Sequence, residues 1–422
     1  MTLPGDVGDF SAKSFTRFRA GRPSPWQREH REHRKVQTSP TSMGAAHSAA
    51  LRAEHELLTA GQVWYQRWRK KTAGGLATAE SLPKTSFTVK DVALGNGLHI
   101  HTAEYVSSVT DGNEGSPLVC MHGFGTGLGI YYASLPALAE RWHGRVYAID
   151  TLGCSLSSRP RWHLGHGANC KVAEVEDFFV DGLERWRKAM NLEQMVLMGH
   201  SLGGYIAVAY AERHPERVER LILVSAVGTP EPPKELSEAH EAAPFAFKMV
   251  LGAWKAGWSP FTVAKMGLGR MMLNRYVNMR FGDAPWVKKP ELEDYLYSSW
   301  TGDNNSAGGY AHSTLLMPGG IGELAYAREP MGRTRIPSLA VPRISAIYGD
   351  RDWMKWQHMA DARRACQRKA GGGPQIEIMH VADASHNVQV DNPLGFVDAV
   401  MATCQGGKGA DGNIFGREYR GM

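Results

Sequence analysis

Short apolar runs alternate along this chain with longer segments in which apolar residues recur at helical spacing. Runs at 117–121, 145–150, 195–198 and 342–348 are too short to be typical helices, and we predict that they form buried strands. The segment 174–190, which lies between two of them, has the amphipathic pattern of a helix. Regular alternation of strand and helix is typical of a mostly parallel sheet flanked by helices. The pattern therefore predicts an α/β fold.

Two regions depart from this alternation. Residues 84–107 are predicted to form a β-hairpin, because two alternating runs flank Asn96-Gly97, a strong signal for a two-residue turn. Between 229 and 336 we expect no strands, and the apolar residues, many of them Met and Trp, fall in helical segments broken by Gly and Pro. Such a helical insertion is predicted to form a cap over a binding site, since Met and aromatic side chains make an adaptable apolar wall.

These patterns also predict the order of domains. An N-terminal extension (1–80) precedes the first part of the core (81–228), the helical cap (229–336), the second part of the core (337–405) and a flexible glycine-rich tail (406–422). Within the extension, residues 1–45 have the composition of a disordered segment, and 46–71 are predicted to be helical. Aromatic and cationic residues at 64–71 suit a membrane interface; alternatively, they pack on the domain and present their charges to water.

The tightest predicted turn contains the strongest candidate for chemistry. Residues 199–203 read Gly-His-Ser-Leu-Gly and join the strand at 195–198 to a helix predicted over 205–214. A Gly-x-Ser-x-Gly turn between strand and helix is typical of the nucleophile elbow of the α/β-hydrolase fold, where the serine projects at the edge of the sheet. We therefore predict that fold, with Ser201 as the nucleophile. The alternative is a glycine-rich turn that happens to contain serine.

A serine hydroxyl needs an adjacent base, and that base needs a carboxylate to fix its tautomer. In this fold the chain order is serine, acid and histidine, each in a loop after a strand. Asp352 and His386 satisfy that order downstream of Ser201. Asp350 is a rival acid, and we prefer Asp352 because the usual spacing places the acid three residues after a glycine, here Gly349.

A glycine-rich loop at 122–127 follows the strand at 117–121. In this fold such a loop supplies one oxyanion-hole amide, and the residue after the nucleophile supplies the other. We therefore predict the amides of Phe124 and Leu202 as the two donors. A phosphate-binding loop is the alternative, although the glycine spacing and the lysine of such loops are missing here. Three further histidines compete with His386 and are expected to serve packing or support: His122, His200 and His380.

Composition and charge narrow the functional classes. The net charge is +6 and the isoelectric point is about 9.0, with cations concentrated in the first 72 residues and over 242–290. Without a nucleic-acid-binding motif, this basicity favours an anionic lipid surface or a phosphate-bearing substrate, with a solvated basic face as the alternative. Five scattered cysteines indicate a reducing compartment, and we expect no metal and no cofactor. No stretch is long and apolar enough to span a bilayer.

Further motifs carry a resemblance to a known family. They are Trp-Ser-Pro-Phe at 258–261, Arg-Phe at 280–281, Tyr-Gly-Asp-Arg-Asp-Trp-Met at 348–354, and the pair His386 and Asp391. With the motifs at 122–125 and 199–205, they make roughly residues 50–405 resemble one α/β-hydrolase subfamily. That subfamily contains lyso-N-acylphosphatidylethanolamine lipase, the lipid-droplet co-activator of adipose triglyceride lipase, and related yeast and plant lipid acyl hydrolases and acyltransferases.

The resemblance has three implications for individual residues. It associates His386 and Asp391, as a His-x4-Asp motif, with acyl transfer to lysophosphatidic acid, with acyl-CoA as co-substrate. The co-activator lacks the nucleophilic serine, whereas this chain keeps Ser201. Ser385 stands where the subfamily usually has glycine, which bears on the shape of the loop before His386.

Together, these observations predict a serine acyl hydrolase of phospholipids or lysophospholipids, with lysophosphatidic acid acyltransferase activity as a further expectation. The expected partners are a lipid substrate and a membrane or lipid-droplet surface, with no nucleic acid. The expected location is cytoplasmic and peripheral on that surface, and the arginine-rich N-terminus makes a mitochondrial location the alternative. The alternative functions are a non-catalytic lipid-droplet co-activator of a lipase and a small-molecule carboxylesterase.

Overall fold

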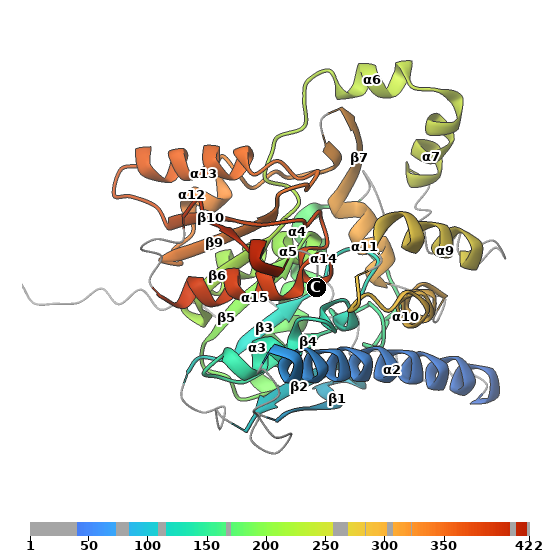
Figure 1. Ribbon diagram of the computed structural model, residues 1–422. Helices are drawn as coiled ribbons and strands as arrows, with labels where there is room; N and C mark the ends of the chain where they lie inside the picture. Colours follow the sequence, from blue (N-terminus) through green and yellow to red (C-terminus); the bar gives the residue numbers. More distant parts are fainter. Residues whose placement is uncertain are drawn as a thin grey trace, which may run out of the picture. The chain divides into compact units, whose positions relative to one another are not determined.

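A nine-stranded sheet lies at the centre of the computed structural model (Figure 1). The structure describes residues 40–72, 84–108, 115–165, 170–255, 269–282, 284–301, 307–321, 323–405 and 411–419. The strands of the sheet are β1 (Thr85–Gly95), β2 (Leu98–Ser107), β3 (Leu118–Met121), β4 (Val146–Ile149), β5 (Met195–His200), β6 (Val218–Val224), β9 (Arg343–Gly349), β10 (Gln375–Val381) and β11 (Ile414–Phe415). Their order is β1-β2-β4-β3-β5-β6-β9-β10-β11.

The strands β4, β3, β5, β6, β9, β10 and β11 run parallel, and the hairpin β1–β2 joins the edge of β4 in antiparallel pairing. Every residue of β3, β4 and β5 is buried. Parallel strands covered on both faces read as continuous apolar runs, which is why these strands were recognisable in the sequence. The predicted α/β fold and the predicted hairpin are confirmed.

Helices flank the sheet in two groups. The first group contains α3 (Leu135–Arg141) and α15 (Pro393–Ala402), which contact each other; the second contains α4 (Val172–Ala189), α5 (Leu202–Arg213), α12 (Arg335–Ser338) and α13 (Gln357–Arg368), which contact one another in succession. Short helical turns complete the core: η1 (Leu128–Tyr131), η3 (Pro215–Arg217), α14 (Val388–Asp391), η4 (Thr403–Gln405) and η5 (Arg417–Tyr419). No helix in the described ranges is long and apolar enough to cross a membrane.

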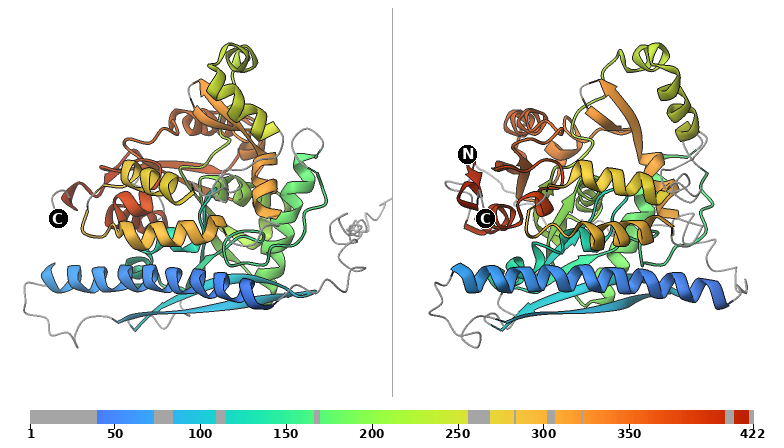
Figure 2. Two further views of the ribbon diagram at one scale, coloured as in Figure 1. Left: turned by 90° about the vertical axis from the view of Figure 1, so that its right-hand side faces the viewer. Right: turned by 45° about the vertical axis from the view of Figure 1, so that its right-hand side comes forward.

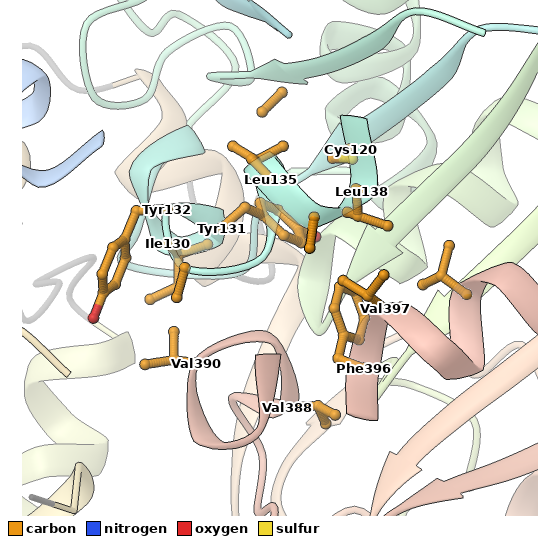
Figure 3. Close-up of a cluster of buried hydrophobic side chains, with 14 of the residues drawn as sticks. Cys120, Ile130, Tyr131, Tyr132, Leu135, Leu138, Val388, Val390, Phe396 and Val397 are labelled. Atoms are coloured by element: carbon orange, nitrogen blue, oxygen red, sulfur yellow. The ribbon is translucent and has the colours of Figure 1, made fainter. Parts of the chain in front are cut away.

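One part of the core joins η1 and α3 to α14 and α15 (Figure 3). Tyr131 from η1 packs against Phe396 from α15 with ring centroids 6.5 Å apart, and its hydroxyl donates to the Met121 carbonyl at 2.9 Å. Val388 and Val390 from α14 are fully buried in the same cluster. The cluster therefore holds α14, and the loop before it, against the segment that follows β3.

The long helix α2 (Pro40–Thr72) contains the helix predicted over 46–71 and runs beside the hairpin β1–β2 and α10 (Lys289–Thr301) (Figure 2). Its Leu57 and Leu58 are fully buried. At Gly61 a Cβ atom would lie 2.0 Å from the Tyr132 carbonyl oxygen, so glycine permits a close approach to the segment after η1. Trp64 is also buried, so at this position the aromatic segment packs on the domain. The disorder predicted for the N-terminus falls, up to residue 39, outside the described residues.

The cap region, residues 229–336, contains five described helices. They are α6 (Leu236–Ala242), α7 (Phe245–Lys255), α9 (Gly269–Arg280), α10 (Lys289–Thr301) and α11 (Ala307–Leu315). The expectation of no strands here is wrong, because β7 (Leu316–Ile321) and β8 (Glu323–Ala327) pair antiparallel. Pro318 and Gly319 disguise this strand in the sequence, since both residues usually interrupt strands. A Cβ atom at Gly319 would lie 1.8 Å from the Glu323 carbonyl oxygen, so the pairing depends on glycine.

The C-terminal tail is partly ordered, contrary to the expectation of a flexible segment. Ile414 and Phe415 form β11, which pairs with β10. Asp411 accepts a hydrogen bond from the Ile378 amide at 2.9 Å and from the Arg363 guanidinium at 2.8 Å. Residues 411–419 therefore extend the sheet, and a glycine-rich composition concealed this because it carries little apolar patterning.

Candidate active site

Ser201 lies on a sharp turn between β5 and α5. Its backbone has φ 53° and ψ −117°, an unusual conformation for serine that costs on the order of 1–3 kcal/mol. The neighbouring glycines allow this turn: a Cβ atom at Gly199 would lie 2.3 Å from the Gly203 carbonyl oxygen, and one at Gly203 would lie 2.4 Å from the His122 carbonyl oxygen. The Ser201 amide donates to the Val224 carbonyl at 2.9 Å, which fixes the turn to β6.

The structure brings Ser201, His386 and Asp352 together from three loops. His386 Nε2 lies 3.0 Å from Ser201 Oγ, and His386 Nδ1 lies 3.2 Å from Asp352 Oδ1. With the proton on Nδ1, the imidazole donates to the carboxylate and presents Nε2 to the serine as an acceptor. Asp352 is 1% exposed and His386 is 14% exposed, so only the imidazole edge reaches solvent.

Asp352 is held in its charged form despite its burial. Burial opposes ionisation, but the hydrogen bond and the charge of His386 outweigh it and hold the pKa of Asp352 below its usual value. The Met354 amide donates to the same Oδ1 atom at 2.9 Å. The ring of Trp353 lies against His386 with centroids 4.8 Å apart and restricts the rotation of the imidazole.

The rival residues lie elsewhere. Asp350 accepts a hydrogen bond from the Ala384 amide at 3.2 Å, so this carboxylate stabilises the loop that leads to His386. His380 lies in β10, with its ring 5.4 Å from that of Trp356. The geometry thus brings Asp352 rather than Asp350 to His386, and His386 rather than His380 to the serine.

His200 and His122 hold the backbone around the site. His200 Nε2 donates to the His386 carbonyl at 2.8 Å, and burial together with the neighbouring His386 lowers the pKa of His200 to about 3. His122 Nε2 accepts from the Thr151 amide at 3.1 Å, so Nδ1 carries the proton and donates to the Gly123 carbonyl at 2.8 Å. Burial lowers the pKa of His122 as well. Both imidazole rings are therefore uncharged near pH 7 and serve to hold the backbone around the site.

The glycine-rich loop lies directly against the elbow. A Cβ atom at Gly123 would lie 2.9 Å from Ser201 Cβ, and Gly125 has φ 73°, so the loop turns back at the serine. The Leu202 amide is in the first turn of α5, where backbone N–H groups lack partners within the helix. Leu202 and the loop that carries Phe124 thus flank Ser201, as an oxyanion hole requires.

Two cap residues that the sequence could not single out reach this loop. Trp300 Nε1 donates to the Gly125 carbonyl at 2.5 Å, and the ring of Trp254 lies 6.3 Å from that of Phe124. Neither contact has a local sequence signal, because a tryptophan in a helical segment is most often a packing residue. In the described residues no group of three or more His, Cys, Asp or Glu side chains is arranged to hold a metal ion.

Asp391 contacts the backbone beside His386. Its Oδ2 atom accepts from the Ser385 amide at 2.8 Å and from the Arg280 guanidinium at 3.4 Å. Burial raises the pKa of Asp391, and the Arg280 charge opposes that rise. The positive φ in this loop falls on Asp383 rather than on Ser385, so serine in place of glycine introduces no left-handed backbone before the histidine.

Comparisons with known proteins agree with this architecture. The family model described as alpha/beta hydrolase fold matches residues 116–268. A 1-acylglycerol-3-phosphate O-acyltransferase of Arabidopsis thaliana is 32% identical to this chain over an alignment of 367 residues, and the match covers 80% of this chain and 82% of that protein. A (lyso)-N-acylphosphatidylethanolamine lipase of Homo sapiens is 29% identical over 76% of this chain and 87% of that protein.

The solved structures show the same fold at lower sequence identity. Naproxen esterase (carboxylesterase NP) from Bacillus subtilis superposes with a TM-score of 0.54 at 15% identity, covering 87% of this chain and 100% of that one. The architecture, the family match and the extensive similarity to the acyltransferase and the lipase lead to one conclusion. The chain belongs to the α/β-hydrolase family, in the subfamily that contains these 1-acylglycerol-3-phosphate O-acyltransferase and (lyso)-N-acylphosphatidylethanolamine lipase relatives.

Proposed function

We propose that this protein is a serine acyl hydrolase of phospholipid or lysophospholipid esters that also transfers acyl groups to lysophosphatidic acid. One observation carries the hydrolytic part: His386 lies within hydrogen-bond distance of both Ser201 Oγ and Asp352 Oδ1. An activated nucleophile needs that arrangement of base and orienting acid. The lipid part rests on the cap region and on the activities for which the relatives are named.

The proposed reaction begins with attack of Ser201 Oγ on the acyl carbonyl carbon. His386 Nε2 takes the hydroxyl proton, and the Asp352 carboxylate stabilises the resulting imidazolium. The amides of Phe124 and Leu202 hold the oxyanion, and each such donor contributes about 3 kcal/mol to transition-state stabilisation. The C–O bond to the leaving alcohol then breaks, and His386 returns the proton to that alcohol, leaving an acyl ester on Ser201.

The second half of the reaction decides between hydrolysis and transfer. His386 takes the proton of an attacking hydroxyl group, and when the bond between the acyl carbon and Ser201 Oγ breaks, His386 returns that proton to Oγ. If the hydroxyl belongs to water, a fatty acid is released. If it belongs to lysophosphatidic acid, phosphatidic acid forms, and with acyl-CoA as the acyl donor the first leaving group is the CoA thiol. Both reactions therefore use one acyl-enzyme.

The cap region supports a substrate at a lipid surface. Six large hydrophobic side chains on α7 and α9 are exposed, Phe245 by 79% of its surface: the others are Met249, Met271, Met272, Tyr276 and Met279. Exposed Lys248, Lys255 and Arg275 lie on the same helices. Apolar side chains flanked by cations suit adsorption to an anionic interface. We propose that the protein acts there as a peripheral protein.

Replacing Ser201 by Ala tests the proposal. Purified protein would be assayed for fatty acid release from a panel of phospholipids and lysophospholipids, with and without acyl-CoA and lysophosphatidic acid. Ser201→Ala should abolish both hydrolysis and transfer, as well as labelling by a fluorophosphonate probe. Ser298→Ala is the control, because that hydroxyl bonds only to its own helix at Asp294. Lipid hydrolysis that survives Ser201→Ala unchanged would overturn the proposal, and an unlabelled wild type would favour a non-catalytic co-activator.

A further inference from the structure

An apolar groove runs beside α2, outside the site described above. It has a volume of about 1020 Å³ and contains neither Ser201, His386 nor Asp352 among its lining residues. One wall is a single face of α2, from His55 to Thr72, which extends over roughly 25 Å at the rise of an α-helix. The opposite wall includes Trp286 and Leu394. The groove is thus about as long as one extended acyl chain.

Indole rings form much of the groove wall. Trp64 and Trp286 meet edge to face with centroids 5.6 Å apart, and Trp68 stacks on Tyr65 at 5.7 Å. Because Trp64 is only 9% exposed, its ring cannot insert into a bilayer and is instead part of the wall. Val63, by contrast, is 40% exposed inside the groove, so it presents an apolar surface that the described residues leave partly uncovered.

The wall opposite α2 is fixed in place. The Trp286 indole Nε1 donates to the Val390 carbonyl at 2.8 Å, and the Tyr132 hydroxyl donates to the Trp286 carbonyl at 2.8 Å. Both bonds belong to the part of the core that holds α14. A groove whose walls are held in this way is preorganised, so a ligand loses little free energy in ordering it.

Three cations line the groove, and two of them lie together near the C-terminal end of α2. Arg67 and Lys71 lie one turn apart on the groove face of α2, and Lys288 lies on the other wall. Within the described ranges none of these three side chains forms an ion pair, and the two groove acids, Glu56 and Glu291, are not paired with them. Glu56 is roughly 22 Å along the helix from Lys71. The charge pattern therefore complements an anionic group beside Arg67 and Lys71.

We propose that this groove binds a single-chain anionic amphiphile, with its acyl chain along Val63 and the indoles and its phosphate or carboxylate group at Arg67 and Lys71. The length of the apolar surface, together with the cations near one end of it, matches a lipid molecule with a single acyl chain. A peptide helix in the same groove would need several apolar anchors at helical spacing and a matching row of polar partners, whereas the charged contacts here are clustered. The site is independent of acyl transfer at Ser201.

The test uses the full-length Ser201→Ala protein, so that binding is measured without turnover and whether or not Ser201 is catalytic. Palmitoyl lysophosphatidic acid, palmitate and neutral monopalmitoylglycerol would be titrated below their critical micelle concentrations by calorimetry. A brominated fatty acid that quenches tryptophan fluorescence provides a second readout. We expect saturable binding of at least one anion, tighter by tenfold or more than binding of the neutral lipid. The two anions separate a phosphate from a carboxylate preference.

Two pairs of matched variants locate the site. Lys71→Glu should weaken anion binding at least tenfold, whereas Lys70→Glu, which makes the same charge change at the adjacent exposed residue outside the groove, should change it less than twofold. Val63→Glu should weaken binding similarly, with Leu51→Glu as the control at an exposed apolar residue of the same helix outside the groove. Thermal unfolding would establish that all four variants fold.

Three results would overturn the proposal. The first is the absence of saturable anion binding in Ser201→Ala. The second is an equal loss of affinity in Lys70→Glu and Lys71→Glu, since that would indicate general attraction to a basic helix end. The third is affinity that persists in both Val63→Glu and Lys71→Glu, since the ligand would then occupy another site.

Discussion

Replacing Asp391 distinguishes a positioning role from a chemical one. In the structure its carboxylate holds the Ser385 amide at 2.8 Å and the Arg280 guanidinium at 3.4 Å, one residue away from His386. Asp391→Ala leaves the amide and a largely buried guanidinium without their acceptor. Asp391→Asn keeps an oxygen that accepts from the Ser385 amide and removes only the charge.

The magnitude follows from these contacts. A hydrogen bond to a charged group contributes about 1.5–3 kcal/mol. Asp391→Ala should therefore lower the free energy of unfolding by about 3 kcal/mol, because it also leaves the Arg280 guanidinium without its ion-pair partner. A displacement of His386 by ~1 Å would reduce the hydrolytic kcat up to ~100-fold. Asp391→Asn should retain most of the hydrolytic rate, because the backbone before the histidine keeps its hydrogen bond.

The assay compares hydrolysis and transfer in the same preparations. Hydrolysis of a p-nitrophenyl ester and acyl transfer to lysophosphatidic acid would be measured for wild type, Asp391→Asn and Asp391→Ala, beside urea unfolding. If Asp391 acts by positioning the loop, the rates of hydrolysis and transfer should fall together in Asp391→Ala, and both should be largely restored in Asp391→Asn. A selective loss of transfer in Asn would refute this reasoning and assign Asp391 a chemical part in the His-x4-Asp motif. An Asn variant as impaired in hydrolysis as Ala would also refute it.

Three further predictions concern the elements around the site. Gly199→Ala should prevent formation of the elbow, because its Cβ would lie 2.3 Å from the Gly203 carbonyl oxygen; soluble protein with a wild-type melting temperature would contradict this. Trp300→Phe keeps an aromatic ring but removes the hydrogen bond to the Gly125 carbonyl, which contributes about 0.5–1.5 kcal/mol. Steady-state kinetics should therefore show a kcat that is roughly two- to tenfold lower and a KM that is unchanged. Burial opposes ionisation of Glu184, but hydrogen bonds from α4 and α5 lower its pKa to about 2. The charged carboxylate therefore stabilises the folded state fully above pH 4.5, and this contribution is lost as the pH falls through 2. Glu184→Gln should therefore reduce the urea midpoint at pH 7 far more than at pH 2.5, and an equal loss at both would show that charge is not the cause.

Local patterns and chain order made the central features predictable. Buried parallel strands read as apolar runs, and the elbow needs glycine at 199 and 203 for steric reasons that leave a direct trace in the sequence. The order of Ser201, Asp352 and His386 follows from where strands end in this fold. These features depend on residues close to one another in the chain or on the fixed topology of the sheet, so the sequence alone identified them.

The contacts of the cap region had no such trace. Arg280 meets Asp391 across 111 residues, and Trp300 meets Gly125 across 175. The sequence marked Arg280 as part of the Arg-Phe motif but did not mark its partner, and Trp300 carries no signal of its own. In both cases the partner is set by how the helices pack. The strand β7 was missed for a different reason: Pro318 and Gly319 argue against a strand locally, and only the tertiary pairing with β8 overrides them. The motif at 258–261 lies outside the described residues.

Ser201 and His386, the proposed catalytic pair, are held in place by different parts of the protein. The Ser201 amide is bound to β6, so its turn is fixed by the sheet itself. The loop of His386 is bound to Asp391, which the cap helix α9 holds through Arg280, and α14 is bound to Trp286 beside the groove of α2. A displacement of α9 would therefore act on the histidine before it acts on the serine. Because the proposed proton transfer needs the 3.0 Å contact between Nε2 and Oγ, we expect substrate that orders the cap helices to stabilise His386 in that position as well.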